Sequence, residues 1–182
     1  MAYDRTPIPL RRACRAKMVP SGNEVILPEG ITVNVTQALG GSFTVYVEGN
    51  LFRIAGQDAE ALGLDPPEQP ELAEEHSETD VEKLIWEQMK LCYDPEIPVN
   101  VVDLGLVYEC KLSNLPEGGK RVDVKMTLTA PGCGMGEVLS KDVKEKLESV
   151  PTVKQANVEI VFDPPWNRAM MSDDAKLQLG LY

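Results

Sequence analysis

The stretch that decides the fold is residues 128–139, which read LTAPGCGMGEVL. Alternating apolar residues precede it over 122–128, as in a half-buried strand. Apolar residues at helical spacing follow it over 135–147, so the stretch joins a strand to a helix. Three glycines within five residues permit a tight turn, and this turn places Cys133 where the helix begins.

Cys133 is the candidate chemical centre of the chain. A thiol at a helix N-terminus faces unpaired backbone N–H groups and the positive end of the helix dipole, and both favour the thiolate. Thr129, Gly132 and Gly134 are supporting candidates because they shape the turn and leave the thiol little cover. The structural alternative is that Cys133 is a small core residue at a tight strand–helix junction. Glycine on both sides favours the reactive thiol.

The length of the chain and the spacing of its cysteines limit the possible classes of protein. A chain of 182 residues can form one domain or two small ones. No apolar run approaches the ~18 residues of a membrane span, and no apolar signal region begins the chain, so we expect a cytoplasmic protein. The four cysteines lie far apart without a C-x-x-C pair, which favours reduced thiols over a zinc ribbon or disulfides.

The negative charge is concentrated in one segment. The net charge is −11, and residues 65–80 contain seven acidic residues and no lysine or arginine. With its prolines, the segment 64–78 is predicted to be an extended acidic linker. An acidic chain is not expected to be a general nucleic-acid binder.

Residues 1–63 predict a small β domain. The first dozen residues resemble a frayed tail, and the basic residues between positions 11 and 17 are interpreted as a solvated surface. Short apolar-alternating runs then predict four or five strands in a compact barrel or curled sheet, with a helical turn after them. We expect this domain to be structural or to bind a partner. The runs are residues 25–27, 31–35, 43–47 and 51–54, and the helical turn is 57–62.

Residues 79–182 predict an α+β domain. The expected order is αββαβ, a two-layer domain with a mixed three-stranded sheet, followed by a short last helix. The first two strands should form an antiparallel hairpin, and the crossover helix should make the second and third strands parallel. Cys92 and Cys110 fall on apolar faces and are interpreted as core residues. The segments are a helix beginning with a capping box at 79–82, strands at 104–112, 122–128 and 158–162, and a helix at 135–150.

Two further segments carry candidate residues. Asp94, Glu96 and Asp103 lie in a proline-containing loop, where their carboxylates could supply a hard oxygen ligand or a charge that faces a partner. Asx-type capping of the loop itself is an equal alternative. Trp166 lies in a rigid turn, where it could be a packed lid over the end of the sheet or an exposed anchor for an interface.

The motifs around these candidates resemble a known family. They occur in the order DPEIP, VDLGLV, TLTAPGC and DPPW, at residues 94–98, 102–107, 127–133 and 163–166. Together they resemble the family of small iron–sulfur assembly proteins, which includes the SufT proteins, the PaaD proteins of phenylacetate degradation and the eukaryotic cytosolic iron–sulfur targeting factor. The resemblance spans residues 79–180, and the β domain, including residues 36–43, resembles the two-domain SufT type.

The resemblance implies a function without catalysis. It implies an accessory factor in iron–sulfur cluster assembly by the SUF system, with Cys133 as the functional cysteine. Gly134 stands where many relatives have proline. The implied partners are the iron–sulfur assembly machinery and apo iron–sulfur proteins, with a homo-oligomer possible and no nucleic acid or membrane. The implied cofactor is a transient iron–sulfur cluster shared with a second chain or a partner.

Ligand chemistry agrees with this implication. Thiolate is the soft ligand that an iron–sulfur cluster requires. One candidate thiolate per chain cannot complete a four-ligand cluster, so a bound cluster needs a second chain, a small thiol or a partner's ligands.

Two alternatives from other classes remain open. One is a thiol-dependent enzyme with Cys133 as nucleophile and Asp103 or Glu96 as helper. The only histidine, His76, lies in the acidic linker, which counts against a cysteine–histidine pair. The other is an RNA-binding module similar to a K-homology domain. The negative net charge and the lack of a basic G-x-x-G loop count against it.

Overall fold

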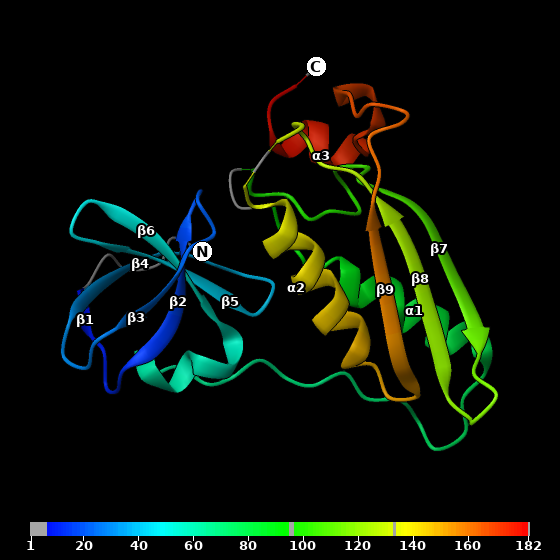
Figure 1. Ribbon diagram of the computed structural model, residues 1–182, viewed down its shortest axis with the longest axis horizontal. Coiled ribbons are helices and arrows are strands. Elements are labelled where there is room, and N and C mark those ends of the chain that lie inside the picture. The colour runs from blue at the N-terminus through cyan, green and yellow to red at the C-terminus, as the bar shows by residue number, and fades with distance from the viewer. Residues whose placement is uncertain (1–6, 95–96, 133, 182) are drawn as a thin grey trace. The chain divides into compact units, whose positions relative to one another are not determined.

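The computed structural model describes residues 7–94, 97–132 and 134–181. The chain divides into two compact units, residues 1–68 and 69–182. Figure 1 shows the helices and strands of both units. Each unit encloses its own apolar cluster. In the described part of the chain, no helix combines the length and apolar character needed to cross a membrane.

The first unit contains a six-stranded antiparallel sheet in the order β1-β4-β5-β6-β2-β3. Its inward side chains alternate with outward ones, so Val33, Val45 and Ile54 are fully buried within it. A 3₁₀ helix (η1, Gly56–Leu62) follows and ends at Gly63, which has a φ of +71°. The strands are β1 Ile8–Pro9, β2 Cys14–Val19, β3 Glu24–Leu27, β4 Thr32–Leu39, β5 Ser42–Val47 and β6 Asn50–Ala55.

The expectation of four or five strands was too low. The strand β1 lies within the first dozen residues, which were interpreted as a frayed tail, and it pairs with β4. The strand β2 pairs with both β3 and β6, although its basic residues Arg15 and Lys17 were interpreted as part of a solvated surface. The sequence does alternate there, because Cys14 and Ala16 are buried while Arg15 is exposed. The inward side chains are small, so their apolar signal is weak beside that of the neighbouring arginines.

The second unit has the predicted αββαβ order and belongs to the α+β class. The first helix begins earlier than predicted, because Ser77 is its N-cap and forms the capping box with Asp80. The elements are α1 Glu78–Met89, β7 Val107–Asn114, β8 Lys120–Met126, α2 Gly136–Glu148 and β9 Val153–Ile160, followed by the 3₁₀ turn η2 Arg168–Met170 and the helix α3 Asp173–Gln178.

The sheet of the second unit has the predicted mixture of directions. The central strand β8 pairs antiparallel with β7 and parallel with β9, so Val124 lies opposite both Cys110 and Val158. The apolar face of the sheet and the helices α1 and α2 contribute to one core cluster. Cys92 is fully buried in it and Cys110 packs against it, as predicted for both residues.

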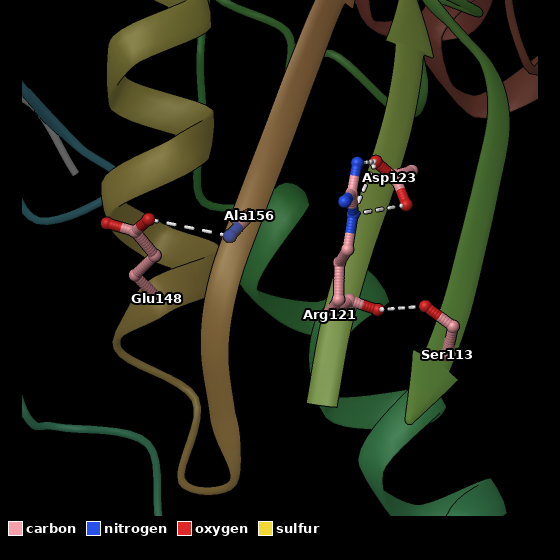
Figure 2. Close-up of polar contacts among 5 residues, drawn as sticks. All are labelled: Ser113, Arg121, Asp123, Glu148 and Ala156. Carbon is pink, nitrogen blue, oxygen red and sulfur yellow. Dashed lines mark hydrogen bonds and ion pairs between the residues drawn. The ribbon is translucent and has the colours of Figure 1, made fainter. Parts of the chain in front are cut away.

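The other face of the sheet is polar (Figure 2). Arg121 forms an ion pair with Asp123 at 2.8 Å, and Ser113 donates a hydrogen bond to the carbonyl of Arg121. At the edge strand β9, the backbone N–H of Ala156 donates to the Glu148 carboxylate of α2 at 3.4 Å. The Glu148 carboxylate occupies a backbone N–H group of the edge strand β9, which opposes pairing of this edge with a further strand.

Candidate functional site

Residues 127–135 join β8 to α2 at the end of the sheet toward which β8 and β9 point (Figure 1). Cys133, the first candidate, lies outside the described residues. On either side of it, Gly132 and Gly134 are exposed, and so are Ala130 and Pro131. Gly132 has a φ of +79° with open space around it, a conformation that glycine adopts most easily. The sequence-predicted glycines are therefore in an open part of the loop.

Both ends of this loop are fixed by packing. Leu128 is 9% exposed and lies directly against Gly136, the first residue of α2, where a Cβ atom would collide with the leucine side chain. Met135 is the N-cap of α2 and contributes no side-chain hydrogen bond to the helix. The Met135 side chain therefore caps none of the backbone N–H groups in the first turn of α2. These N–H groups favour a negative charge at the end of the loop.

The carboxylates of the second candidate loop stabilise the loop itself. Asp94 is buried, and its Oδ1 accepts a hydrogen bond from the backbone N–H of Ile97 at 3.1 Å. Asn100 donates from Nδ2 to Oδ2 of Asp103 at 2.6 Å, and its own Oδ1 accepts from the N–H groups of Val102 and Asp103. The Asp94 contact is the Asx-type contact of the capping alternative, whereas in the second group the Asx-type contacts are made by Asn100 and the Asp103 carboxylate bonds to the Asn100 side chain. Glu96 lies outside the described residues.

The structure around residues 104–106 shows why the motif DLGL contains two leucines with a glycine between them. Leu104 and Leu106 are fully buried, and Gly105 between them has a φ of +72°. The backbone carbonyl of Met170 lies so close to Gly105 that a Cβ atom there would overlap with it. Two independent features therefore require glycine at position 105: the positive φ of the backbone and the close approach of another segment.

Trp166 holds this segment in place as a packed lid. Its indole Nε1 donates a hydrogen bond of 2.7 Å to the carbonyl of Leu104, and its ring packs against the core. The Tyr108 hydroxyl donates to the carbonyl of Pro164 at 2.7 Å, and the N–H of Ser172 donates to the carbonyl of Asp103 at 2.8 Å. The turn that carries Trp166 is thereby bonded to the DLGL segment.

Three segments that are distant in the sequence meet at this end of the sheet. The N–H of Thr127 donates to the carbonyl of Leu106, and the N–H of Val161 donates to the carbonyl of Met126, each at 2.8 Å. The structure thus brings the surroundings of Asp103, Thr129 and Trp166 together. It adds Thr127, which is part of the TLTAPGC motif but was not among the candidate residues, because the alternation of Val122, Val124, Met126 and Leu128 assigns position 127 to the polar face of the strand.

The described cysteines are poor candidates for chemistry. Cys14 and Cys92 are buried, and burial raises the pKa of the Cys110 thiol to about 11. Among the residues that the structure describes, no three histidine, cysteine or carboxylate side chains group together as a metal site. A complete ligand set for a cluster is therefore not found within the described part of the chain.

The second unit is similar to known proteins. A family model described as iron–sulfur cluster assembly protein matches residues 82–160. A protein of Porphyromonas gingivalis named Fe-S protein maturation auxiliary factor is 46% identical over 100 residues, which are 54% of this chain and 90% of that relative. The Fe-S protein maturation auxiliary factor SufT of Staphylococcus aureus is 43% identical over 88 residues, which are 48% of this chain and 96% of that relative.

Two solved structures are also similar to the chain. A domain of unknown function from Bacillus anthracis is 33% identical, with a TM-score of 0.49, and the match covers 57% of this chain and 95% of the domain. The protein Rv1466 of Mycobacterium tuberculosis, described as associated with [Fe-S] complex assembly and repair, is 28% identical, with a TM-score of 0.37. That match covers 63% of this chain and 97% of Rv1466.

Proposed function

The chain belongs to the family of iron–sulfur cluster assembly proteins, and we propose that it assists the maturation of iron–sulfur proteins as an adaptor or transient cluster carrier through Cys133. The observation that carries this proposal is the loop 129–134, in which Ala130, Pro131, Gly132 and Gly134 are exposed while Leu128 and Gly136 fix its ends. These described positions are accessible to a partner, and the fixed ends keep the loop at one place on the domain.

The ligand chemistry favours a temporary cargo. A cluster bound through Cys133 takes its remaining ligands from a second copy, a small thiol or a partner protein, because the described residues offer no group of three. An incompletely ligated cluster is easily released to a client whose own cysteines complete the set. The partners of this function are the iron–sulfur assembly machinery and apo iron–sulfur proteins.

The proposed role is accessory rather than catalytic. The relatives from Porphyromonas gingivalis and Staphylococcus aureus are named maturation auxiliary factors, and the proposal extends that role to this chain. In the described segments around the loop, Asp94 and Asp103 are engaged in hydrogen bonds within their own loop. This placement supports a structural task for these carboxylates rather than that of a general base for the thiol.

Anaerobic reconstitution with iron and sulfide tests the proposal. Wild-type protein should bind iron and sulfide with the absorbance and Mössbauer signals of a cluster, and Cys133→Ser should bind neither while remaining folded. Cys110→Ser is the matched control, since it makes the same atomic change on a packed strand face. It should lower stability and retain cluster binding. The mass of the reconstituted protein distinguishes a cluster held by one chain from one shared by two.

Function in cells gives a second test. In a strain that lacks the protein, iron–sulfur enzymes should lose activity under iron limitation, and Cys133→Ser should not restore that activity. Full restoration by a stably folded Cys133→Ser protein would refute the cysteine-centred role. If the wild-type protein binds a cluster and Cys133→Ser does not restore enzyme activity, the protein is a carrier. If the wild-type protein restores enzyme activity but never binds a cluster, it is an adaptor.

A further inference from the structure

The strand β7 is an open edge of the sheet in the second unit. The sheet has the order β7-β8-β9, so β7 pairs with β8 alone (Figure 1). Among the described residues, no other segment forms a backbone hydrogen bond with β7. The opposite edge differs, because the Glu148 carboxylate accepts from the N–H of Ala156 in β9. An open edge is a template for pairing with a further strand.

The charges on the polar face of this sheet alternate in sign from strand to strand. Glu109 of β7 lies opposite Lys125 of β8, which lies opposite Glu159 of β9. In the next row, Lys111 of β7 lies opposite Asp123 of β8. Glu109 forms ion pairs with Lys111 at 2.8 Å and with Lys125 at 3.6 Å. A carboxylate and an ammonium group therefore stand two positions apart on the open edge.

This spacing is complementary to itself. Residues directly opposite each other in an antiparallel pair share one face of the sheet. If β7 of a second copy pairs antiparallel about Cys110, Glu109 of each copy lies opposite Lys111 of the other, and the alternation of signs continues across the new pair. A register centred on Lys111 would place two ammonium groups side by side, and a register centred on Glu109 would place two carboxylates together. The charges therefore favour the register centred on Cys110.

We propose that β7 is an interaction surface for a second copy of this chain, which pairs antiparallel with it about Cys110 and joins the two sheets edge to edge. On the other face of the sheet, Cys110 and Leu112 pack against the core cluster, so the new pair extends an apolar face as well as a polar one. The Lys111 side chain is 69% exposed. A lysine at an edge opposes pairing with most strands, whereas an antiparallel second copy supplies Glu109 opposite it.

The pairing should be weak and depend on protein concentration. A register shift between Val107 and Glu109 interrupts the ladder with β8 and limits the length of regular strand at the edge. A short strand pair buries less surface than a permanent interface. The inference uses no residue of the cysteine loop, so it stands independently of the carrier function.

Sedimentation of the full-length, iron-free protein in reducing buffer tests the pairing. Wild type should associate as its concentration rises. Glu109→Lys and Lys111→Glu should each weaken self-association about tenfold or more, because each change creates two like-charge pairs. An equal mixture of the two variants should associate about as strongly as wild type, because every facing pair then has opposite signs. The matched control is Glu159→Lys, the same charge reversal in the same row at the other edge, which should stay within about twofold of wild type.

Amide hydrogen exchange locates the interface. Protection of residues 107–114 should rise with concentration in wild type and stay constant in Glu109→Lys. A wild-type protein that remains monomeric, single variants that associate as wild type does, or protection that rises only outside β7 would overturn the inference. So would a mixture of two folded variants that fails to associate, with folding checked by circular dichroism. Reconstitution of a cluster in a protein that fails these tests would leave the carrier function intact.

Discussion

The indole Nε1 of Trp166 donates a hydrogen bond of 2.7 Å to the backbone carbonyl of Leu104, 62 residues earlier in the chain. Leu104 is fully buried, so its carbonyl has no access to water as an alternative partner. This bond fixes the DLGL segment against the turn that follows β9. The two motifs therefore act as one structural support for the end of the sheet that carries the cysteine loop.

Trp166→Phe should measure the strength of this support. Phenylalanine keeps an aromatic ring and removes the donor, so the free energy of unfolding should fall by about 1–3 kcal/mol, as expected for an unpaired buried carbonyl. Urea unfolding followed by circular dichroism gives the value. The matched control is Trp86→Phe on α1, where the side chain is 39% exposed, and the change should stay within about 0.5 kcal/mol. Equal losses in both variants would show that the indole bond is unimportant.

Gly105→Ala should be more destabilising than a glycine substitution that changes only the backbone conformation. Alanine at a positive φ costs about 1–2 kcal/mol at either Gly105 or Gly118, whose φ values are +72° and +89°. Gly118 has open space around it, whereas the Met170 carbonyl crowds Gly105. The clash should add about 1–3 kcal/mol at Gly105 alone. Urea midpoints of the two variants provide the comparison, and equal midpoints would contradict the close approach.

Hydrophobic patterning predicted the order of elements in the second unit, but not all of their bounds. The strand expected at 104–112 is β7 Val107–Asn114, because Leu104 and Gly105 lie in a turn, and the strand expected at 158–162 is β9 Val153–Ile160. The alternation over 122–128 and the helical spacing over 135–147 correctly predicted a strand, a turn and a helix, and the crossover rule predicted the parallel pairing of β8 with β9. In the first unit the strand β2 was missed, because Cys14 and Ala16 are small and the exposed Arg15 dominates the local composition. Periodicity is informative only where the inward side chains are large.

The contacts of the candidate site could be predicted only in part. The motifs indicated which segments contain the candidate residues, and the Asx-type contact of Asp94 follows from local chemistry. The bonds from Trp166 to Leu104 and from Thr127 to Leu106 join segments far apart in the sequence, and no periodic pattern records such pairs.

Limited proteolysis should cut the chain between the two compact units. Residues 64–77 contain no helix or strand and include the acidic, proline-containing linker. Brief digestion with a glutamate-specific protease should release a stable fragment that begins near Ser77 and retains the core around α1. Mass spectrometry locates the cut, and thermal unfolding of the purified fragment tests its independence. Unfolding of the fragment on release would contradict two independently folding units.

Cys110 should make stability depend on pH in the alkaline range. Burial raises the pKa of its thiol from 9.0 to about 11, with a smaller contribution from the charge of Glu82. Below pH 9 the thiol is protonated in both the folded and the unfolded chain, so its contribution to stability is complete. Between pH 9 and 11 the unfolded chain loses the proton first, and the free energy of unfolding should fall. Urea unfolding of wild type should show a steeper decline over this range than that of Cys110→Ala, since the other titrating groups are common to both. Parallel curves would contradict the raised pKa.

Thr152→Gly should stabilise the second unit. Thr152 is a β-branched residue with a φ of +81°, and its buried Oγ1 has no hydrogen-bond partner among the residues that the structure describes. Relief of this strain should exceed the entropy cost of glycine and raise the free energy of unfolding by about 1 kcal/mol. Thr152→Ala removes the hydroxyl but keeps a Cβ atom at the same φ, so it should gain less than Thr152→Gly. Chemical unfolding of the three proteins side by side isolates the backbone contribution as the difference between the two variants. A glycine variant no more stable than the alanine variant would show that the positive φ carries no strain at this turn.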